Sequence, residues 1–402
     1  MVKSGASKSG KTDREVRIVA DPRVRFQARP PGGPAARPAR TRPLPGRAPR
    51  PGAAPGYRRD PVRAFFNSDN YAPVLPEVMA ALAAVNESHV PAYGADAVTA
   101  RVEARLREEL GDDARAFLVL NGTGANVVAL RAMLKPWQGV VCADSAHLNR
   151  DEGGAPEAVG RIKLLSIPSP DGKLTPEMVA TWLVRIGDEH AVQPGVVSVT
   201  QSTELGTLYT PDELAALAEQ AHANGMRMHI DGARLGNAAA ALGVPLRAIT
   251  TDVGADAVSF GGTKAGLMLG EAIVLPRGEF ADALPYLRKQ SMHLASKMRY
   301  VAAQFEALLS DELWRRSAAH SNAMAARLAG AVRDLEGVTI TQPVQANVVF
   351  AVLPPGVAEA LQREWGFYQW DEHTGEVRWM CSWDTREEDV DAFAAAVAAA
   401  LP

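Results

Sequence analysis

The chain contains little cysteine: two of its 402 residues, Cys142 and Cys381, carry a thiol. Each stands alone in a short apolar run, so the sequence holds neither a disulfide framework nor a Cys-x-x-Cys metal site. A disulfide-rich secreted fold is therefore excluded, and we expect no metal ligands. We interpret both thiols as core residues and predict a reducing, cytoplasmic location.

Long apolar runs are also missing. No stretch reaches the roughly 18 apolar residues that a membrane-spanning helix needs, and no apolar region typical of a signal peptide lies near the first residue. With 47% hydrophobic and 22% charged residues, the composition is that of a globular protein with ample material for a core. We therefore expect a soluble protein that has no membrane partner.

Acidic residues are scarce in the first part of the chain. Residues 1–63 hold 16 Lys and Arg against 4 Asp and Glu, together with 11 of the 28 prolines. Such a segment cannot bury enough apolar surface to offset its chain entropy, so we predict a disordered tail. Three interpretations of the tail remain open: a polyanion-binding arm, a transit peptide, or upstream sequence translated from an early start codon.

Two features of the tail suggest nucleotide or nucleic-acid binding, and neither is convincing. Residues 5–12 match the phosphate-loop pattern GxxxxGK[ST], but four residues precede them, too few for the strand that must deliver such a loop. The basic tail lacks interleaved aromatic residues.

The remaining residues, 64–402, hold 27 Lys and Arg against 42 Asp and Glu, a net charge of −15 that repels polyanions. We expect no nucleic-acid partner for the folded part.

From Phe65 onward, apolar runs of strand length alternate with segments of helical period. We expect strands at Ala116–Leu120, Val140–Ala143, Gly195–Thr200, Met226–Asp231, Ala255–Phe260, Glu271–Leu275, Val348–Leu353 and Val377–Cys381. We expect helices at Val98–Leu110, Asn126–Leu134, Pro176–Ile186, Pro211–Asn224, Ser296–Leu309 and Glu387–Leu401. Short, wholly apolar strands separated by helices are typical of a mainly parallel sheet covered on both faces.

The pattern therefore predicts an α/β fold: a three-layer sandwich around a mainly parallel sheet, plus a smaller α+β domain at the C-terminal end. We place the large domain at residues 85–285. The small domain would combine residues 65–84 with residues 286–402.

Small residues follow the first predicted strand. Residues 121–126 read Asn-Gly-Thr-Gly-Ala-Asn and lead into a helix, so backbone N–H groups and the Thr123 hydroxyl can approach an anion at a helix N-terminus. This arrangement suits a phosphate group. Glycines also occur in strand-to-helix turns for purely conformational reasons, so the turn alone leaves both interpretations open.

Two charged residues lie at the ends of later apolar strands. Asp231 ends one strand and would be costly to bury without a cation or strong donors, although a structural pair with Arg234 would also satisfy it. Lys264 stands among glycines and small residues after the next strand, a setting that suits an amine forming an imine with a flat carbonyl cofactor. A phosphate turn, a carboxylate for a pyridine nitrogen and a lysine for an aldehyde together match pyridoxal 5′-phosphate (PLP).

The same residues carry a family resemblance over essentially all of residues 65–402. The chain resembles the threonine aldolases of the β-eliminating lyase branch of fold-type-I PLP enzymes. The matching segments are Asn67-Ser68-Asp69-Asn70, residues 89–96, Gly122–Asn126, Ala146-His147, Gly153–Pro156, Asp231–Arg234, Ser259–Lys264, Val377-Arg378 and Ser382-Trp383-Asp384.

The resemblance implies roles for individual residues. Lys264 would carry the imine to PLP, Asp231 would pair with the pyridine nitrogen, and His147 would stack on the ring. Gly122 and Thr123 would hold the phosphate.

Other implied roles concern the substrate and a second subunit. Ser68, Arg234 and Arg378 would bind the substrate carboxylate. Met298-Arg299 resembles the family segment that reaches a neighbouring subunit's phosphate, so Arg299 would be a cofactor ligand in a homodimer or homotetramer with shared active sites. One stretch departs from the low-specificity branch, which has Asn-Thr-His where this chain has Ser202-Thr203-Glu204. The catalytic base is therefore either His147 or Glu204.

The implied activity is cleavage of the Cα–Cβ bond of a β-hydroxy-α-amino acid, for example L-threonine or L-allo-threonine to glycine and acetaldehyde. Two alternatives remain. The first is a related PLP lyase or a phenylserine-type aldolase, because a different bond at Cα can be aligned with the same ring. The second, more remote, is a polyanion-binding protein that acts through the basic tail.

We predict that Lys264→Ala abolishes both the visible absorbance of the lysine-bound cofactor and turnover, whereas Glu204→Gln leaves measurable activity. Orientation supplies roughly 7–11 kcal/mol of barrier reduction, and a general base about 10²–10⁴-fold. Absorbance spectra and product formation from both purified variants check the prediction. A Lys264→Ala protein that kept the absorbance band would contradict the assignment of the lysine.

Overall fold

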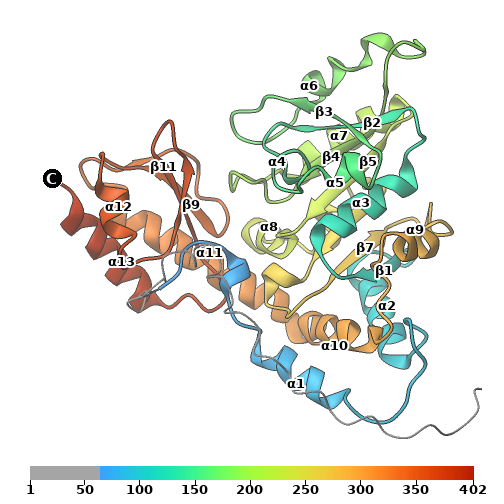
Figure 1. Ribbon diagram of the computed structural model, residues 1–402, viewed down its shortest axis with the longest axis horizontal. Helices are drawn as coiled ribbons and strands as arrows, with labels where there is room; N and C mark the ends of the chain where they lie inside the picture. The colour runs from blue at the N-terminus through green and yellow to red at the C-terminus, as the bar shows by residue number, and fades with distance from the viewer. Residues whose placement is uncertain (1–63) are drawn as a thin grey trace, which may run out of the picture. The chain divides into compact units, whose positions relative to one another are not determined.

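The computed structural model describes residues 64–402, so the predicted tail and the phosphate-loop match lie outside the described residues. The described part contains a seven-stranded sheet and a four-stranded sheet (Figure 1). The larger sheet has the order β1-β7-β6-β5-β4-β2-β3. Its strands are β1 (Arg115–Val119), β2 (Gln138–Ala143), β3 (Lys163–Ile167), β4 (Gln193–Thr200), β5 (Arg227–Gly232), β6 (Ala257–Gly261) and β7 (Glu271–Leu275).

The larger sheet is mainly parallel. The four pairs that join β3, β2, β4, β5 and β6 are parallel, whereas β7 pairs antiparallel with both β6 and β1. Because β7 runs against its neighbours, its first residue lies beside the last residue of β6: Glu271 pairs with Gly261. The start of β7 therefore shares an edge of the sheet with the carboxyl ends of the parallel strands.

Helices pack against both sheets. They are α1 (Pro76–Ala84), α2 (Ala97–Leu110), α3 (Gly122–Met133), α4 (His147–Arg150), α5 (Ala155–Ala158), α6 (Pro176–Ala180), α7 (Pro211–Ala223), α8 (Leu235–Leu242), α9 (Leu284–Gln290), α10 (Met298–Leu309), α11 (Leu313–Val332), α12 (Val357–Leu361) and α13 (Glu387–Ala400). Short 3₁₀ turns are η1 (Asp69–Tyr71), η2 (Leu183–Arg185), η3 (Leu246–Ile249), η4 (Thr263–Ala265) and η5 (Ser310–Glu312). No helix within residues 64–402 combines the length and the apolar character needed to cross a bilayer.

Alternating side chains build two cores on the two faces of the larger sheet. Adjacent residues of a strand point to opposite faces. Val140 and Val196 accordingly lie in one hydrophobic cluster with residues of α3 and α9, whereas Val141 and Val197 lie in a second cluster with residues of α2, α7 and α10. A sheet buried on both faces accounts for the wholly apolar strands and for the three layers.

The smaller sheet is antiparallel, with the order β10-β11-β9-β8. Its strands are β8 (Thr339–Ile340), β9 (Val348–Val352), β10 (Tyr368–Asp371) and β11 (Glu376–Met380), and α11, α12 and α13 accompany it (Figure 1). Its core is aromatic: the Phe393 ring stacks on Phe66 with centroids 4.7 Å apart and meets Trp379 edge-on at 5.3 Å. The Met380 N–H donates to the Phe66 carbonyl at 2.9 Å, so this core fixes the start of the described chain against β11.

The predicted fold class is confirmed, and most expected strands and helices lie where the sequence placed them. The expectation missed β3, β8 and β10. Strand β3 lies at the edge of the sheet and alternates exposed with buried residues, so it is not a continuous apolar run. The helix expected at Pro176–Ile186 is broken, because α6 ends at Ala180 and η2 begins at Leu183.

The helix expected from Asn126 begins four residues earlier. Asn121 occupies the N-cap, with its Oδ1 accepting the Gly124 N–H at 2.8 Å, so Gly122 is the first helical residue of α3. The glycine turn is thus itself the N-terminus of the helix. The division into domains at residues 85 and 285 stays a prediction. Leu75 and Val301 of α10 lie in the segments expected to form the small domain. Both side chains nevertheless belong to a core of the larger sheet.

We predict that Phe393→Ala lowers the free energy of unfolding by about 3–5 kcal/mol, because it opens a cavity in the aromatic core of the smaller sheet. Val184→Ala is the control, since the Val184 side chain is 80% exposed and should change stability little. Urea unfolding followed by tryptophan fluorescence measures both. Equal free energies of unfolding for the two variants would contradict the claim that Phe393 stabilises this core.

Candidate active site

Two cavities lie where the parallel strands end, and Asn70, His147 and Lys264 line both. The larger encloses about 460 Å³ and the smaller about 200 Å³. Of the residues predicted from the sequence, the larger cavity brings together Ser68, His147, Glu204, Arg234, Lys264 and Arg378. The smaller brings together Gly122, Thr123, His147, Asp231 and Lys264.

The N-terminus of α3 forms one wall of the smaller cavity. Nothing lies within 4 Å of the point where a Cβ on Gly122 would sit, so space is open beside the backbone there. Gly124 faces the opposite situation, because a Cβ would collide with the His293 ring. Leu120 N–H donates to His293 Nδ1 at 3.3 Å, and the ring thus supports the turn from behind. The helix α3 has twelve residues, and its open N-terminus suits an anion.

Asp231 is the buried acid of the smaller cavity. It follows Ile230 in β5, and its carboxylate accepts the Asn126 Nδ2–H at 2.8 Å and the Ala233 N–H at 3.1 Å. The same Asn126 nitrogen donates to Glu152 Oε1 at 2.9 Å. These donors fix the position of the carboxylate and leave lone pairs on both oxygens for a further donor.

His147, the first residue of α4, connects this acid network to the larger cavity. Its Nδ1 lies 3.1 Å from Glu152 Oε1, and this hydrogen bond raises the pKa of the ring against the effect of burial. Its backbone N–H donates to Glu204 Oε1 at 2.6 Å. Burial and the nearby Asp231 raise the pKa of Glu204, whose Oε1 also accepts the Thr200 hydroxyl. Both candidate bases therefore lie in one hydrogen-bonded group.

Lys264 sits in the turn η4 after β6 and lines both cavities. Burial, and then the Arg234 charge, lower the pKa of its amine, while Asp69, Asp231 and Glu271 oppose the shift. A depressed pKa makes the neutral, nucleophilic amine accessible. Gly266 closes the turn in the left-handed region with φ of 107°, a conformation that favours glycine.

Two arginines line the larger cavity. Arg234 Nε and Nη2 donate to Asp69 Oδ2 at 2.6 Å and Oδ1 at 3.0 Å, a bidentate pair. Arg378 donates instead to the Asn67 carbonyl at 2.9 Å, and its guanidinium lies over the Trp370 ring at 4.7 Å. Burial, and then Arg234, lower the pKa of Arg378 to about 10.

Arg378 forms no salt bridge within residues 64–402, and its buried Nε has no hydrogen-bond partner there. A cation held without a carboxylate, beside a second arginine, is suited to bind an anionic ligand.

Arg299 is not part of either cavity. Its guanidinium donates to the carbonyls of Glu87 at 2.9 Å and Ser88 at 3.1 Å, next to a separate pocket formed by residues 88–92 and 296–299. The structure of one chain therefore does not bring Arg299 to Lys264.

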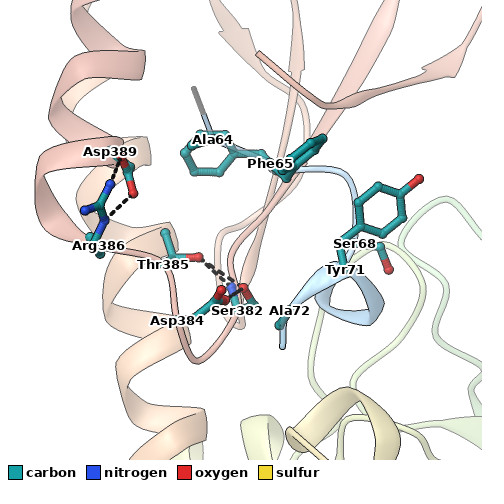
Figure 2. Close-up of a pocket in the computed structure, with 11 residues that line it drawn as sticks. Ala64, Phe65, Ser68, Tyr71, Ala72, Ser382, Asp384, Thr385, Arg386 and Asp389 are labelled. Atoms are coloured by element: carbon teal, nitrogen blue, oxygen red, sulfur yellow. Dashed lines mark hydrogen bonds and ion pairs between the residues drawn. The ribbon is translucent and has the colours of Figure 1, made fainter. Parts of the chain in front are cut away.

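Ser382 and Asp384, from the segment Ser382-Trp383-Asp384 that matched the family, line another pocket of about 200 Å³ (Figure 2). Ser382 Oγ donates to Asp384 Oδ1 at 2.5 Å, and the Ser382 N–H donates to Thr385 Oγ1 at 2.8 Å. Trp383 Nε1 donates to the Pro73 carbonyl at 2.9 Å. The Trp383 bond ties the residues after β11 to the N-terminal segment, and none of the three residues lines a cavity with Lys264.

Several residues of the site had no assigned role in the sequence analysis. They are Asp69, Asn126, Glu152 and Glu271, together with Tyr368 and Trp370 on β10. Asp69 and Asn126 lie inside matching segments, and Glu152 directly precedes one. Glu271 begins a buried strand whose other residues are all apolar. Burying a charge there is costly, and this cost could have identified Glu271 from the sequence.

Comparisons with known proteins identify the family of the chain. The model of the family described as Beta-eliminating lyase matches residues 66–354. A low specificity L-threonine aldolase from a Pseudomonas species is 41% identical over 338 residues, covering 84% of this chain and 97% of that protein. Its counterpart from Pseudomonas aeruginosa is 42% identical over 81% of this chain and 94% of that protein.

Solved structures agree as well. A threonine aldolase from Leishmania major superimposes with a TM-score of 0.79 at 30% identity, over 83% of this chain and 98% of that one. An enzyme described as a putative L-allo-threonine aldolase from Listeria monocytogenes, 17% identical with a TM-score of 0.67 over 85% of this chain and 97% of that one, shares the fold. The chain thus belongs to the Beta-eliminating lyase family, whose threonine aldolases depend on PLP.

Proposed function

We propose that the chain cleaves the Cα–Cβ bond of β-hydroxy-α-amino acids, converting L-threonine or L-allo-threonine to glycine and an aldehyde. The observation that carries the proposal is the position of Lys264, which lines one cavity with two arginines and the adjoining cavity with Asp231. The names of the 41–42% identical relatives support the same reaction.

The residues of the smaller cavity fit PLP. The open space beside Gly122 at the start of α3 suits the phosphate, the remaining lone pairs of Asp231 suit a pyridinium N–H, and the depressed pKa of Lys264 suits bond formation to an aldehyde. When bound, PLP supplies an electron-withdrawing ring that takes up the electron pair of the broken bond. Asp231 would keep that ring protonated.

The arginines would orient the substrate. Arg234 is already held by Asp69, so it presents a fixed positive charge, and Arg378 has free donors on the same cavity. A carboxylate bound between them fixes the rotation about Cα and thereby decides which bond is aligned for cleavage. Ser68, on the same wall, would add a neutral donor.

Either His147 or Glu204 would take the proton from the β-hydroxyl. Both line the larger cavity, and the pKa of each is raised above its ordinary value, which makes each a stronger base. Glu204 also anchors the backbone of His147, so removing its carboxylate would displace the ring as well.

A phenylserine-type aldolase is the second candidate. Tyr368 and Trp370 line the larger cavity, which at about 460 Å³ has room for a bulkier side chain than the methyl group of threonine. Aromatic walls favour an aromatic substituent on Cβ.

We also propose a homodimer or homotetramer in the cytoplasm. Arg299 and residues 88–92 line a pocket separate from the chain's own Lys264 site, and large apolar side chains are exposed nearby, with Tyr93 53% and Met292 82% exposed. A second copy would cover these residues. Both cysteines are free and buried, which suits a reducing compartment.

We expect the purified protein to show a visible absorbance band that shifts when glycine is added, and to release glycine and the matching aldehyde from L-threonine, L-allo-threonine or phenylserine. The shift follows if glycine displaces Lys264 from the cofactor. Spectroscopy and product chromatography provide the two measurements. Ammonia and an oxo acid as the products would instead identify an eliminating lyase, and a colourless protein that stayed so after addition of PLP would refute the proposal.

We predict that Asp69→Asn raises the KM for the amino acid about tenfold, because Arg234 loses the charged partner that orients it. The free energy of unfolding at neutral pH should fall by about 3–5 kcal/mol, since a buried arginine loses its ion pair. Steady-state kinetics and urea unfolding measure the two effects. An unchanged KM would remove Arg234 from the carboxylate site.

The stability loss should depend on pH. Burial opposes ionisation of Asp69, but Arg234 and Lys264 hold its pKa below the ordinary value of 3.8. The stabilisation is therefore present above pH 3.8 and disappears as the pH falls through the folded-state pKa. The difference in stability between the wild type and Asp69→Asn should shrink in that acidic range.

A further inference from the structure

Glu271 is a buried carboxylate that the proposed reaction does not use. It is the first residue of β7, is 7% exposed, and is followed by Ala272–Leu275, which are wholly buried. Its antiparallel pairing with Gly261 places it beside the end of β6, where the turn that carries Lys264 begins. It lines the smaller cavity together with that lysine.

Both oxygens of Glu271 bind the lysine turn. Oε2 accepts the Gly262 N–H at 2.7 Å, and Oε1 accepts the Thr263 hydroxyl at 2.7 Å. The Thr263 oxygen in turn accepts the Gly270 N–H at 3.3 Å, which links the turn back to the start of β7. One carboxyl side chain thus fixes the two residues that precede Lys264 through two hydrogen bonds, which are strongest when the group is ionised.

The backbone of the turn is also closely packed. A Cβ on Gly262 would lie 2.5 Å from both the Gly270 carbonyl and Leu267, so the backbone passes in close contact with its surroundings. A small displacement of this turn would move the Lys264 amine relative to Asp231 and the arginines.

Glu271 is also one of three carboxylates that act on the amine. The charged and titratable groups that act on Lys264 or Glu271 include Asp69, His147, Asp231 and Arg234. The larger cavity, which Lys264 also lines, adds Asp151, Glu204 and Arg378. Asp69 is engaged by Arg234, and Asp231 by Asn126 and the Ala233 amide, whereas the lysine's own turn binds Glu271. Burial raises the pKa of Glu271 to about 7, while Thr263, Gly262 and Lys264 act to lower it.

We propose that Glu271 is a positioning residue for the reaction: it fixes the turn that presents Lys264 and supplies a negative charge that favours the protonated form of the lysine linkage. The inference rests on the proposed role of Lys264 as the residue that binds the cofactor. It assigns two separable effects to one side chain, one of geometry through Thr263 and Gly262 and one of charge.

The test compares three variants of the holoenzyme with the wild type. Glu271→Gln removes the charge and one acceptor, and Thr263→Val removes the hydroxyl but keeps the carboxyl group. Glu387→Gln is the matched control, because that carboxylate pairs with Arg327 on the surface and its side chain is 61% exposed. The measurements are the pH midpoint of the visible band of the lysine-bound cofactor, kcat, KM and the melting temperature.

We expect Glu271→Gln to move the band's midpoint to lower pH, because the protonated linkage loses a stabilising negative charge. Its kcat should fall about tenfold to 100-fold while KM changes less, since a displaced lysine affects the chemical step more than binding. Thr263→Val should lower kcat and move the midpoint less than Glu271→Gln does, because the carboxyl group remains in place. Glu387→Gln should match the wild type in all four measurements.

A Glu271→Gln protein with a lowered melting temperature but wild-type midpoint and kcat would overturn the inference, because Glu271 would then serve stability alone. Should Glu271→Gln fail to fold, Glu271→Asp and Thr263→Val decide the question: both keep a carboxyl group and disturb the turn, and wild-type kcat in both would overturn the inference. A wild-type protein without a visible band or aldehyde product would instead refute the proposed function.

Discussion

The burial of charge at the edge where the parallel strands end is the constraint on which the site depends. A lone ion removed from water is strongly destabilised, so each buried charge needs partners within the fold. Asp231 is held by Asn126, Asp69 by Arg234, and Glu271 by the turn before Lys264. Because the partners are already in place, these charges need little rearrangement when a ligand binds, which is the condition for effective electrostatic stabilisation.

The direction of β7 decides which groups can meet. In a parallel strand, residues at the first position lie at the edge opposite the ligand site. Strand β7 runs against β6, so its first residue lies at the ligand edge, beside Gly261. A side chain at that position can reach the turn that leaves β6, and Glu271 does so. The same carboxylate at the start of β5 or β6 would lie at the far edge of the sheet.

The sequence predicted the cavity residues whose chemistry is unusual for their position. Asp231 and Lys264 stand out because each is a charge at the end of an apolar strand, and the same argument applied to Glu271 would have identified it. The link from Asn126 to Glu152 could not be found in this way, since it depends on how α3 packs near α5, and long-range packing leaves no local pattern. The break after α6 was missed because Thr181 and Trp182 do not interrupt the apolar period.

One short segment joins the arginines of the two sheets. Arg234 follows β5 of the larger sheet, and Arg378 lies in β11 of the smaller one, so their separation depends on both cores. The segment from Asn67 to Asp69 contacts both: the Asn67 carbonyl accepts from Arg378, and the Asp69 carboxylate accepts from Arg234. Asn347 Nδ2 reaches Asp69 Oδ2 at 3.3 Å and the Cys381 carbonyl at 2.7 Å. The distance between the two guanidinium groups, which decides whether one carboxylate can bind both, therefore depends on these three residues and on the contact of Arg234 Nη2 with Met380 Sδ of β11 at 3.1 Å.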